Sequence, residues 1–192
     1  MKHFIALLAF SAVPLVGIAM AQQPGDHHGH SHDHAHTEPA PTTAVAVFTP
    51  TKGNDTHGVV TFEKVKGGIK VTGRIENLTP GEHGFHVHQY GDLRKDDATS
   101  TGGHFNPTNT VHAGRDAMIR HVGDMGNVTA DENGVAEFSF VDDDLAFSGP
   151  TSIIGRGLIV HAGKDDLTSQ PSGAAGPRVG MAVIGWANPE LD

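Results

Sequence analysis

Histidine is the residue type through which this sequence is best equipped for chemistry. The chain of 192 residues contains 15 histidines and no cysteine. Beyond residue 42 the histidines are His57, His83, His86, His88, His104, His112, His121 and His161. Neutral imidazole is a good ligand for copper, zinc and nickel, so the composition points to metal binding. The lack of cysteine excludes thiolate catalysis and cysteine-based zinc sites.

A pair of histidines lies in the segment GFHVHQYGD. His86 and His88 are two residues apart, so a β-strand directs both imidazoles to the same face, where they can share one metal. His83, three residues before His86, faces the other way, and we expect it to be buried and hydrogen-bonded in a structural role. The pair alone is weak evidence for a metal site.

A second group lies in GGHFNPTNTVHAGRDAMIRHVGDMGN, a segment rich in glycine. Its candidate ligands are His104, His112, His121 and Asp124. Three imidazoles and one carboxylate are a suitable set for a closed tetrahedral zinc site. On spacing alone, scattered surface histidines are an alternative. His161, near the end of the apolar segment GLIVHA, is by itself equally consistent with a buried core residue.

The elements that must position these side chains are β-strands. From residue 44 onward, short alternating or β-branched runs are separated by Gly, Pro, Asn and Asp, a pattern typical of an all-β sandwich or barrel. The predicted strands are 44–49, 57–64, 68–76, 83–90, 134–141, 157–162 and 179–187. Two long segments, 91–120 and 163–178, interrupt the pattern and are expected to be functional loops.

Residues 1–21 have the pattern of a secretory signal peptide. Lys2 precedes an apolar run that ends in Ala19-Met20-Ala21, a small-x-small cleavage site. A membrane anchor is the alternative, but roughly 15 apolar residues fall short of the ~20 that span a bilayer. We therefore expect cleavage, a periplasmic or secreted protein, and no membrane anchor.

Residues 22–42 are a polar segment with too little apolar surface to fold, so we expect a disordered tail. Its histidines are His27, His28, His30, His32, His34 and His36. Such a density of imidazole predicts weak binding of additional copper, zinc or nickel, with a solvated linker as the alternative. The remaining residues, 43–192, have a suitable length for one domain with one core.

The charge of the chain restricts its partners. The formal net charge of −9 becomes −10 once Lys2 is removed with the signal peptide. This composition gives no electrostatic support for a nucleic-acid or anionic-membrane partner. A small anionic substrate would need local positive charge.

Five segments, in this order, resemble successive signatures of the copper/zinc superoxide dismutase family: GFHVHQYGD, GGHFNP, HVGDMGN, SIIGRGLIVHAGKDDL and GAAGPRVGMAVIG. The resemblance extends from about residue 44 to residue 189. It implies an eight-stranded Greek-key β-barrel with two long functional loops.

The resemblance also implies the ligands of both metals. It assigns copper to His86, His88, His104 and His161, and zinc to His104, His112, His121 and Asp124. His104 would bridge the two metals through its deprotonated ring. Asp165 matches a carboxylate that links a copper-ligand histidine to a zinc-ligand histidine and fixes the ring tautomers. Arg178 matches the arginine that holds the anion above the copper.

The implied activity is conversion of superoxide to dioxygen and hydrogen peroxide by alternate reduction and reoxidation of copper. Arg178 and His104 are the expected catalytic residues, because Arg178 attracts the anion and His104 can accept and return a proton. The alternative is a periplasmic copper carrier or buffer, which has no use for Arg178 or an intact zinc site. A copper-only relative is disfavoured because all four zinc positions carry a competent ligand. A homodimer is possible.

Two features depart from the family pattern. Ala98 and Met181 occupy the positions of the family's intrasubunit disulfide, and we expect them to pack as an apolar pair. Their substitution leaves open whether the chain has high thermal stability, a rigid Arg178 and the dimer interface. The segment from Asp165 to Arg178 is short and, apart from Lys164 just before it, lacks lysines that steer anions. Association is therefore expected to be slower than in some relatives.

Overall fold

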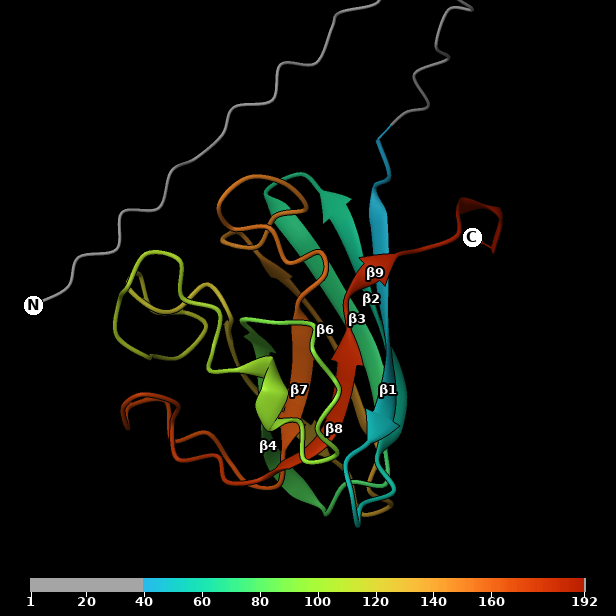
Figure 1. Ribbon diagram of the computed structural model, residues 1–192, viewed down its shortest axis with the longest axis vertical. Helices are drawn as coiled ribbons and strands as arrows, with labels where there is room; N and C mark the ends of the chain where they lie inside the picture. The colour runs from blue at the N-terminus through green and yellow to red at the C-terminus, as the bar shows by residue number, and fades with distance from the viewer. Residues whose placement is uncertain (1–39, 192) are drawn as a thin grey trace, which may run out of the picture. The chain divides into compact units, whose positions relative to one another are not determined.

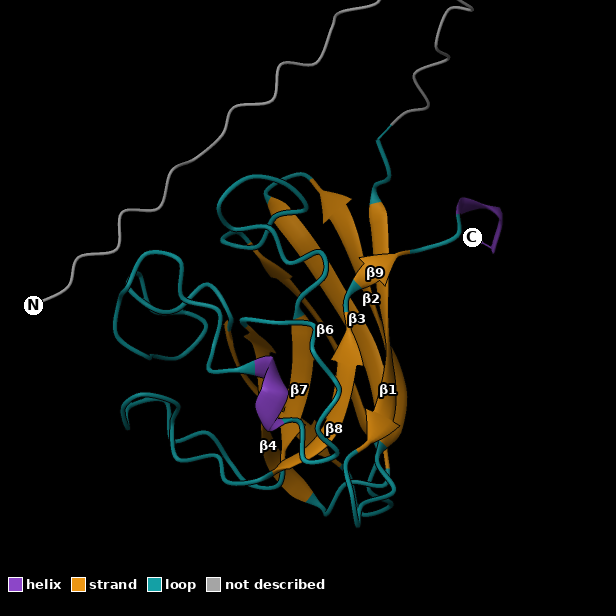
Figure 2. Cartoon of the chain, in the orientation of Figure 1, coloured by secondary structure: helices purple, strands orange, loops and turns teal. Residues whose placement is uncertain are grey.

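The computed structural model describes residues 40–191, in which β-strands are joined by loops and two short 3-10 turns (Figures 1 and 2). The strands are β1 (Thr43–Pro50), β2 (His57–Val65), β3 (Gly68–Glu76), β4 (Gly81–His88), β5 (Asp124–Ala130), β6 (Ala136–Asp142), β7 (Gly157–His161), β8 (Arg178–Val183) and β9 (Gly185–Trp186). Within these residues no helix has the length and apolar character needed to cross a membrane. The expected signal peptide and residues 22–39 of the expected tail lie outside the described residues.

The strands form one antiparallel sheet that is nearly closed on itself. Their order is β5-β4-β7-β8-β1-β2-β3-β6, and the short β9 pairs with β1. β1 connects the two halves, because residues 43–48 pair with β2 whereas Thr49 and Pro50 pair with β8. β5 and β6, at the two ends of this order, lie against each other. The predicted eight-stranded Greek-key barrel is therefore confirmed.

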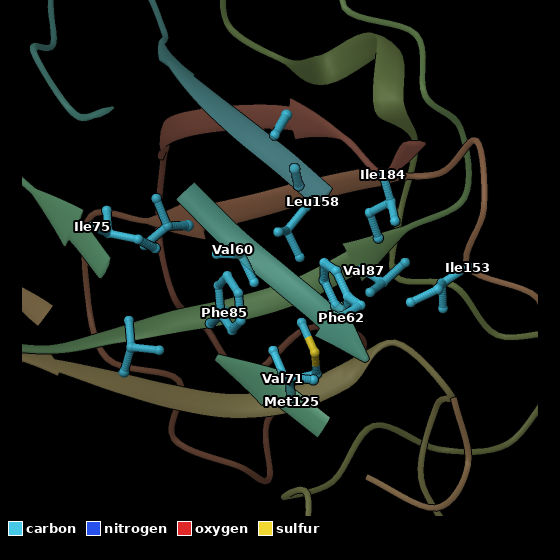
Figure 3. Close-up of a cluster of buried hydrophobic side chains, with 14 of the residues drawn as sticks. Val60, Phe62, Val71, Ile75, Phe85, Val87, Met125, Ile153, Leu158 and Ile184 are labelled. Carbon is cyan, nitrogen blue, oxygen red and sulfur yellow. The ribbon is translucent and has the colours of Figure 1, made fainter. Parts of the chain in front are cut away.

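Alternation of apolar and polar residues explains how the strands build the core. In β3, Ile69, Val71 and Ile75 are buried, while most of the residues between them face solvent. Side chains from both halves of the barrel meet inside it (Figure 3). Phe85 of β4 lies at the centre of this core, with its ring centroid 5.1 Å from that of Phe138. Apolar burial of this kind is the main stabilising contribution to the barrel.

The predicted strands agree with the structure to within two residues at their ends, apart from two larger differences. The segment 179–187 is divided, because Ile184 separates β8 from β9. β5 was not predicted: its first residues are Asp124, Met125, Gly126 and Asn127, a run with low β-propensity. It is a strand because β4 pairs with it, with a bulge between Gly84 and His86.

An apolar cluster lies at the two positions where the resemblance implies a disulfide. Ala98, from the loop after β4, packs with Ile159 of β7 and Met181 of β8, and all three side chains are buried. Leu93 covers the cluster from the outside. The expected apolar pair is thus present, and it attaches the loop to the sheet by packing alone.

We expect Met181→Ala to destabilise the protein, because it removes a large buried side chain from this cluster. Loss of a buried Met typically costs about 2–3 kcal/mol, which lowers the melting temperature of a domain of this size by roughly 5–10 °C. Met118→Ala is the matched control, since Met118 is fully exposed and should leave the melting temperature unchanged. Calorimetry on both variants measures the difference, and equal melting temperatures would contradict the role assigned to the cluster.

Candidate metal centre

Two long loops cover β4 and β7 and carry most of the candidate site residues. The first, residues 89–123, connects β4 to β5, and the second, residues 162–177, connects β7 to β8. Both project on the same side of the barrel in Figure 1. Strand β4 supplies His86 and His88, and β7 ends at His161, so the sheet fixes three of the candidate ligands directly.

The first group of candidate ligands consists of four buried histidines. One ring nitrogen from each of His86, His88, His104 and His161 lies within 4.8 Å of the others. The rings of His86 and His104 are closest, with centroids 4.0 Å apart. The structure therefore brings together all four residues for which the sequence predicted copper.

Hydrogen bonds fix the tautomers of these rings. His88 Nδ1 donates to the carbonyl of Gly102 at 2.9 Å, and His161 Nδ1 donates to the carbonyl of Gly176 at 2.9 Å. A carbonyl oxygen only accepts, so the proton lies on Nδ1 and the lone pair on Nε2. His86 has the opposite tautomer. Its Nε2 carries the proton and donates to Asp165 Oδ2 at 2.7 Å, so the lone pair is on Nδ1.

The nitrogens with free lone pairs fit a metal ion. Among the described residues, five buried side-chain nitrogens have no hydrogen-bond partner: His86 Nδ1, His88 Nε2, His104 Nε2, His121 Nδ1 and His161 Nε2. A buried polar atom without a partner typically costs about 1–3 kcal/mol, so five in one region call for a ligand. Four converging imidazole lone pairs suit copper.

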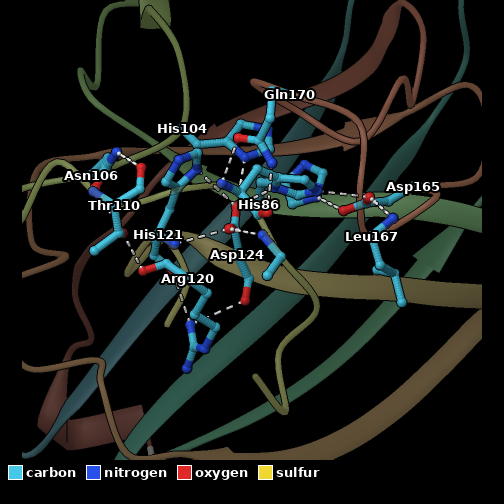
Figure 4. Close-up of polar contacts among 12 residues, drawn as sticks. His86, His104, Asn106, Thr110, Arg120, His121, Asp124, Asp165, Leu167 and Gln170 are labelled. Carbon is cyan, nitrogen blue, oxygen red and sulfur yellow. Dashed lines mark hydrogen bonds and ion pairs between the residues drawn. The ribbon is translucent and has the colours of Figure 1, made fainter. Parts of the chain in front are cut away.

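The second group is arranged around Asp124 (Figure 4). Asp124 Oδ2 accepts the backbone N–H groups of Ala113 at 3.1 Å and His121 at 3.0 Å. Its Oδ1 lies 2.7 Å from His104 Nδ1, 2.9 Å from His112 Nδ1 and 3.2 Å from His121 Nδ1. Three imidazoles and one oriented carboxylate oxygen fit zinc.

A buried carboxylate connects the two groups. Asp165 Oδ2 lies 2.7 Å from His86 Nε2, and Asp165 Oδ1 lies 3.0 Å from His112 Nε2. Asn127 of β5 holds the backbone of Asp165 from both sides, donating to its carbonyl at 2.9 Å and accepting its N–H at 2.8 Å. Asp165 thus joins a histidine of the first group to a histidine of the second.

Burial and charge set the protonation states of the metal-free site. Burial lowers the pKa of His86 to about 4 and that of His161 to about 3, and it holds the pKa of His88 well below its ordinary value. Burial also opposes charging of His112, but hydrogen bonds to Asp124 and Asp165 outweigh it and raise the pKa to about 9. His86, His88 and His161 are therefore neutral at pH 7 and ready to bind metal.

The two carboxylates remain ionised. Burial raises their pKa values, but hydrogen bonds from His104 and His112 to Asp124, and from His112 and His86 to Asp165, lower both pKa values below the ordinary range.

Arg120 supports the second group and was not predicted. Its Nη1 donates to the carbonyls of His121, Val122 and Asp124 at 3.2, 3.3 and 3.1 Å, and its Nη2 donates to Asp142 at 2.9 Å. This buried guanidinium joins the turn before β5 to the end of β6. An arginine in a polar loop gives no sequence signal of burial, so only the structure identifies it.

His83 has the structural role expected from the sequence. It is buried, and its two ring nitrogens lie 2.7 Å from the carbonyl oxygens of His161 and Thr79. It therefore holds the backbone of His161 from the side of the sheet opposite the first group.

A cavity of about 370 Å³ opens onto the first group. Its walls include His88, His104, Gln89, Ser172 and Arg178. Among the described residues that line it, Arg178 is the only Lys or Arg. Lys164, which lies just before the short loop segment, instead pairs with Glu82 at 2.5 Å.

The sequence of residues 56–184 matches the family described as copper/zinc superoxide dismutase (SODC). The chain belongs to the copper/zinc superoxide dismutase family. It is 47% identical over 137 residues to the Cu-Zn superoxide dismutase of Paramecium bursaria Chlorella virus 1, covering 68% of this chain and 73% of the relative. It is 39% identical over 171 residues to the extracellular Cu-Zn superoxide dismutase of Brugia pahangi, covering 84% of this chain and 85% of the relative.

A solved structure described as the clock protein EA4 has a similar fold. It has a TM-score of 0.72 and 42% sequence identity, covering 79% of this chain and 99% of that chain. Together these findings confirm the family, the enzyme class, superoxide as substrate, and copper and zinc as cofactors of this superoxide dismutase.

We expect the metal-free dismutase to be most stable near pH 6.5. The lowered pKa values of His86 and His161 contribute stability that is present above pH 6.5 and is lost as the pH falls towards 4 and 3. The raised pKa of His112 contributes stability that is present below pH 6.5 and is lost as the pH rises through about 9.

Melting temperatures of the metal-free protein between pH 4 and pH 10 measure this profile. The variant His112→Gln should lose the decline on the alkaline side and keep the one on the acid side. A melting temperature that rises steadily from pH 5 to pH 9 would contradict the prediction.

Proposed function

We propose that this superoxide dismutase holds copper with His86, His88, His104 and His161, and zinc with His104, His112, His121 and Asp124. The observation that carries this assignment is the set of buried ring nitrogens that have lone pairs and no hydrogen-bond partner among the described residues. Each of the four proposed copper ligands contributes one of them.

Copper, when bound, supplies the alternation between two oxidation states that dismutation requires, whereas zinc is redox-inert. The chain's own part in the proton transfer falls to His104. Its Nδ1 faces the zinc group and its Nε2 faces the copper group. We assign to His104 Nε2 the proton that is held in one half of the cycle and returned in the other.

Arg178 supplies a fixed positive charge at the cavity. Its Nη1 donates to the carbonyl of Ala98 and, at 3.0 Å, to Thr101 Oγ1, and its Nη2 donates to the carbonyl of Gly102 at 2.6 Å. These acceptors orient the guanidinium before the substrate arrives, which is the condition for effective electrostatic stabilisation. The Gly102 carbonyl also accepts a hydrogen bond from His88, so the same backbone oxygen orients both Arg178 and a proposed copper ligand.

A copper carrier without turnover is not favoured. A carrier has no need for a positively charged side chain beside the metal, for a complete zinc group, or for a carboxylate that joins the two. Arg178, Asp124 and Asp165 are all oriented by hydrogen bonds in this chain.

We also propose that residues 1–21 are a signal peptide, that 22–42 are a histidine-rich tail that binds additional copper, zinc or nickel, and that 43–192 are the catalytic domain. The Brugia pahangi relative is named extracellular, which supports secretion or export to the periplasm. A homodimer is proposed as well, supported by the exposed apolar side chains of Val183 and Trp186 on the C-terminal strands.

Metal analysis combined with a superoxide-consumption assay tests the ligand assignment. We expect His88→Ala and His161→Ala each to abolish activity and copper binding at the domain while zinc binding is retained, because neither ring belongs to the zinc group. His57→Ala, which alters an exposed histidine remote from both groups, is the control. Loss of zinc along with copper in either variant would show that the ligand partition is wrong.

We expect Arg178→Ala to lower the rate of superoxide consumption by about ten-fold or more with copper content unchanged, since the anion loses its positive partner. Arg178→Lys keeps a charge and should lose less. Arg94→Ala removes an exposed arginine, paired with Asp92, from the loop between β4 and β5 and should have little effect. A rate for Arg178→Ala equal to that of Arg94→Ala would contradict the proposed role.

A further inference from the structure

The side chain of Gln170 forms two hydrogen bonds with the backbone of His112, a proposed zinc ligand. The N–H of His112 donates to Gln170 Oε1 at 2.8 Å, and Gln170 Nε2 donates to the carbonyl of His112 at 2.8 Å. Both backbone polar groups of His112 are thus paired with one side-chain amide. Gln170 lies in the loop 162–177, and His112 lies in the other long loop.

The same loop also holds the ring of His112. Asp165 Oδ1 lies 3.0 Å from His112 Nε2. Asp165 therefore forms a hydrogen bond with the ring, while Gln170 forms hydrogen bonds with the main chain. Gly173, with φ of 65°, allows this close approach, because a Cβ at this position would clash with the Asp165 carboxylate and the His112 ring. The loop therefore lies directly on the zinc ligand.

Hydrogen bonds within the loop 162–177 connect the segment around Gln170 to the residues that line the cavity. Asp166 accepts the N–H groups of Thr168 and Ser169, and the Asp166 and Gly173 backbones are joined at 2.8 Å. Pro171, the next residue after Gln170, and Ser172 line the cavity that leads to the copper group. A displacement of the Gln170 end of the loop displaces this wall.

We propose that Gln170 is a positioning residue that couples retention of zinc at His112 to the position of the loop bordering the copper cavity. This inference rests on the proposed function, since it takes His112 as a zinc ligand. Groups that orient a metal ligand typically change metal affinity by 10–100-fold when they are removed. The two hydrogen bonds from one amide are such a support.

Zinc release from the full mature chain, loaded with copper and zinc, tests the proposal. Zinc is transferred to a chromophoric chelator, and the slow phase is assigned to the domain because weak sites in the tail release zinc quickly. We expect Gln170→Leu to accelerate this slow phase by about ten-fold or more, with copper content unchanged. Gln170→Asn keeps the amide but shortens its reach, so it should act in the same direction even if the leucine variant folds poorly.

Thr168→Ala is the matched control. Thr168 lies in the same loop, and its hydroxyl contacts only Asp166, so zinc release should stay within two-fold of the parent. Cobalt placed in the zinc group gives a readout that a general loss of stability would not move. Its visible absorption bands should shift in both Gln170 variants and stay unchanged in Thr168→Ala.

The two hypotheses fail in different ways. If the parent protein shows no slow zinc phase and no tetrahedral cobalt spectrum, the proposed zinc group is wrong. If the parent shows both, and the Gln170 variants release zinc at the parent rate with an unchanged cobalt spectrum, the group stands and the role of Gln170 is overturned.

Discussion

The hydrogen bonds to the buried carboxylate of Asp165 are the interactions on which the arrangement of the two histidine groups depends. An isolated charge in a protein interior is costly, so the surrounding structure must provide donors. His86, His112 and the N–H of Leu167 do so, at 2.7, 3.0 and 2.7 Å. Their convergence on one carboxylate has structural consequences. It orients the His86 ring on β4, fixes the His112 ring in the first loop, and connects both rings to the second loop.

Most of the barrel could be predicted from the sequence because its strands alternate apolar and polar residues. β3 shows this alternation throughout, and its predicted bounds, 68–76, are those observed. β5 could not be predicted, because it begins with Asp124 and contains Gly126 and Asn127. Asn127 instead holds the backbone of Asp165, in the second loop, through two hydrogen bonds. Function here overrides the strand preference of the local sequence.

The proposed ligand residues stand out in the sequence, but the residues that support them do not. His86 and His88 have a strand spacing, and the motifs around His104, His121 and His161 resemble a known family. Gln170 and His112 are 58 residues apart, and Arg120 and Asp142 are 22 apart, with no motif to join them. Such contacts arise from loop conformation, which depends on the whole fold. Interactions that tune a site are therefore harder to predict than those that define it.

The apolar cluster of Ala98, Ile159 and Met181 has a consequence for how the protein matures. A disulfide at this position would have to be formed by an oxidant, and an incorrect pairing would have to be repaired. Packed methionine and alanine side chains assemble during folding itself and need neither oxidant nor isomerase. Thiol reductants have no bond to break in this chain, since it contains no cysteine. The folded state can therefore form whatever the thiol redox state of its surroundings, and this cluster needs no chemical step after synthesis.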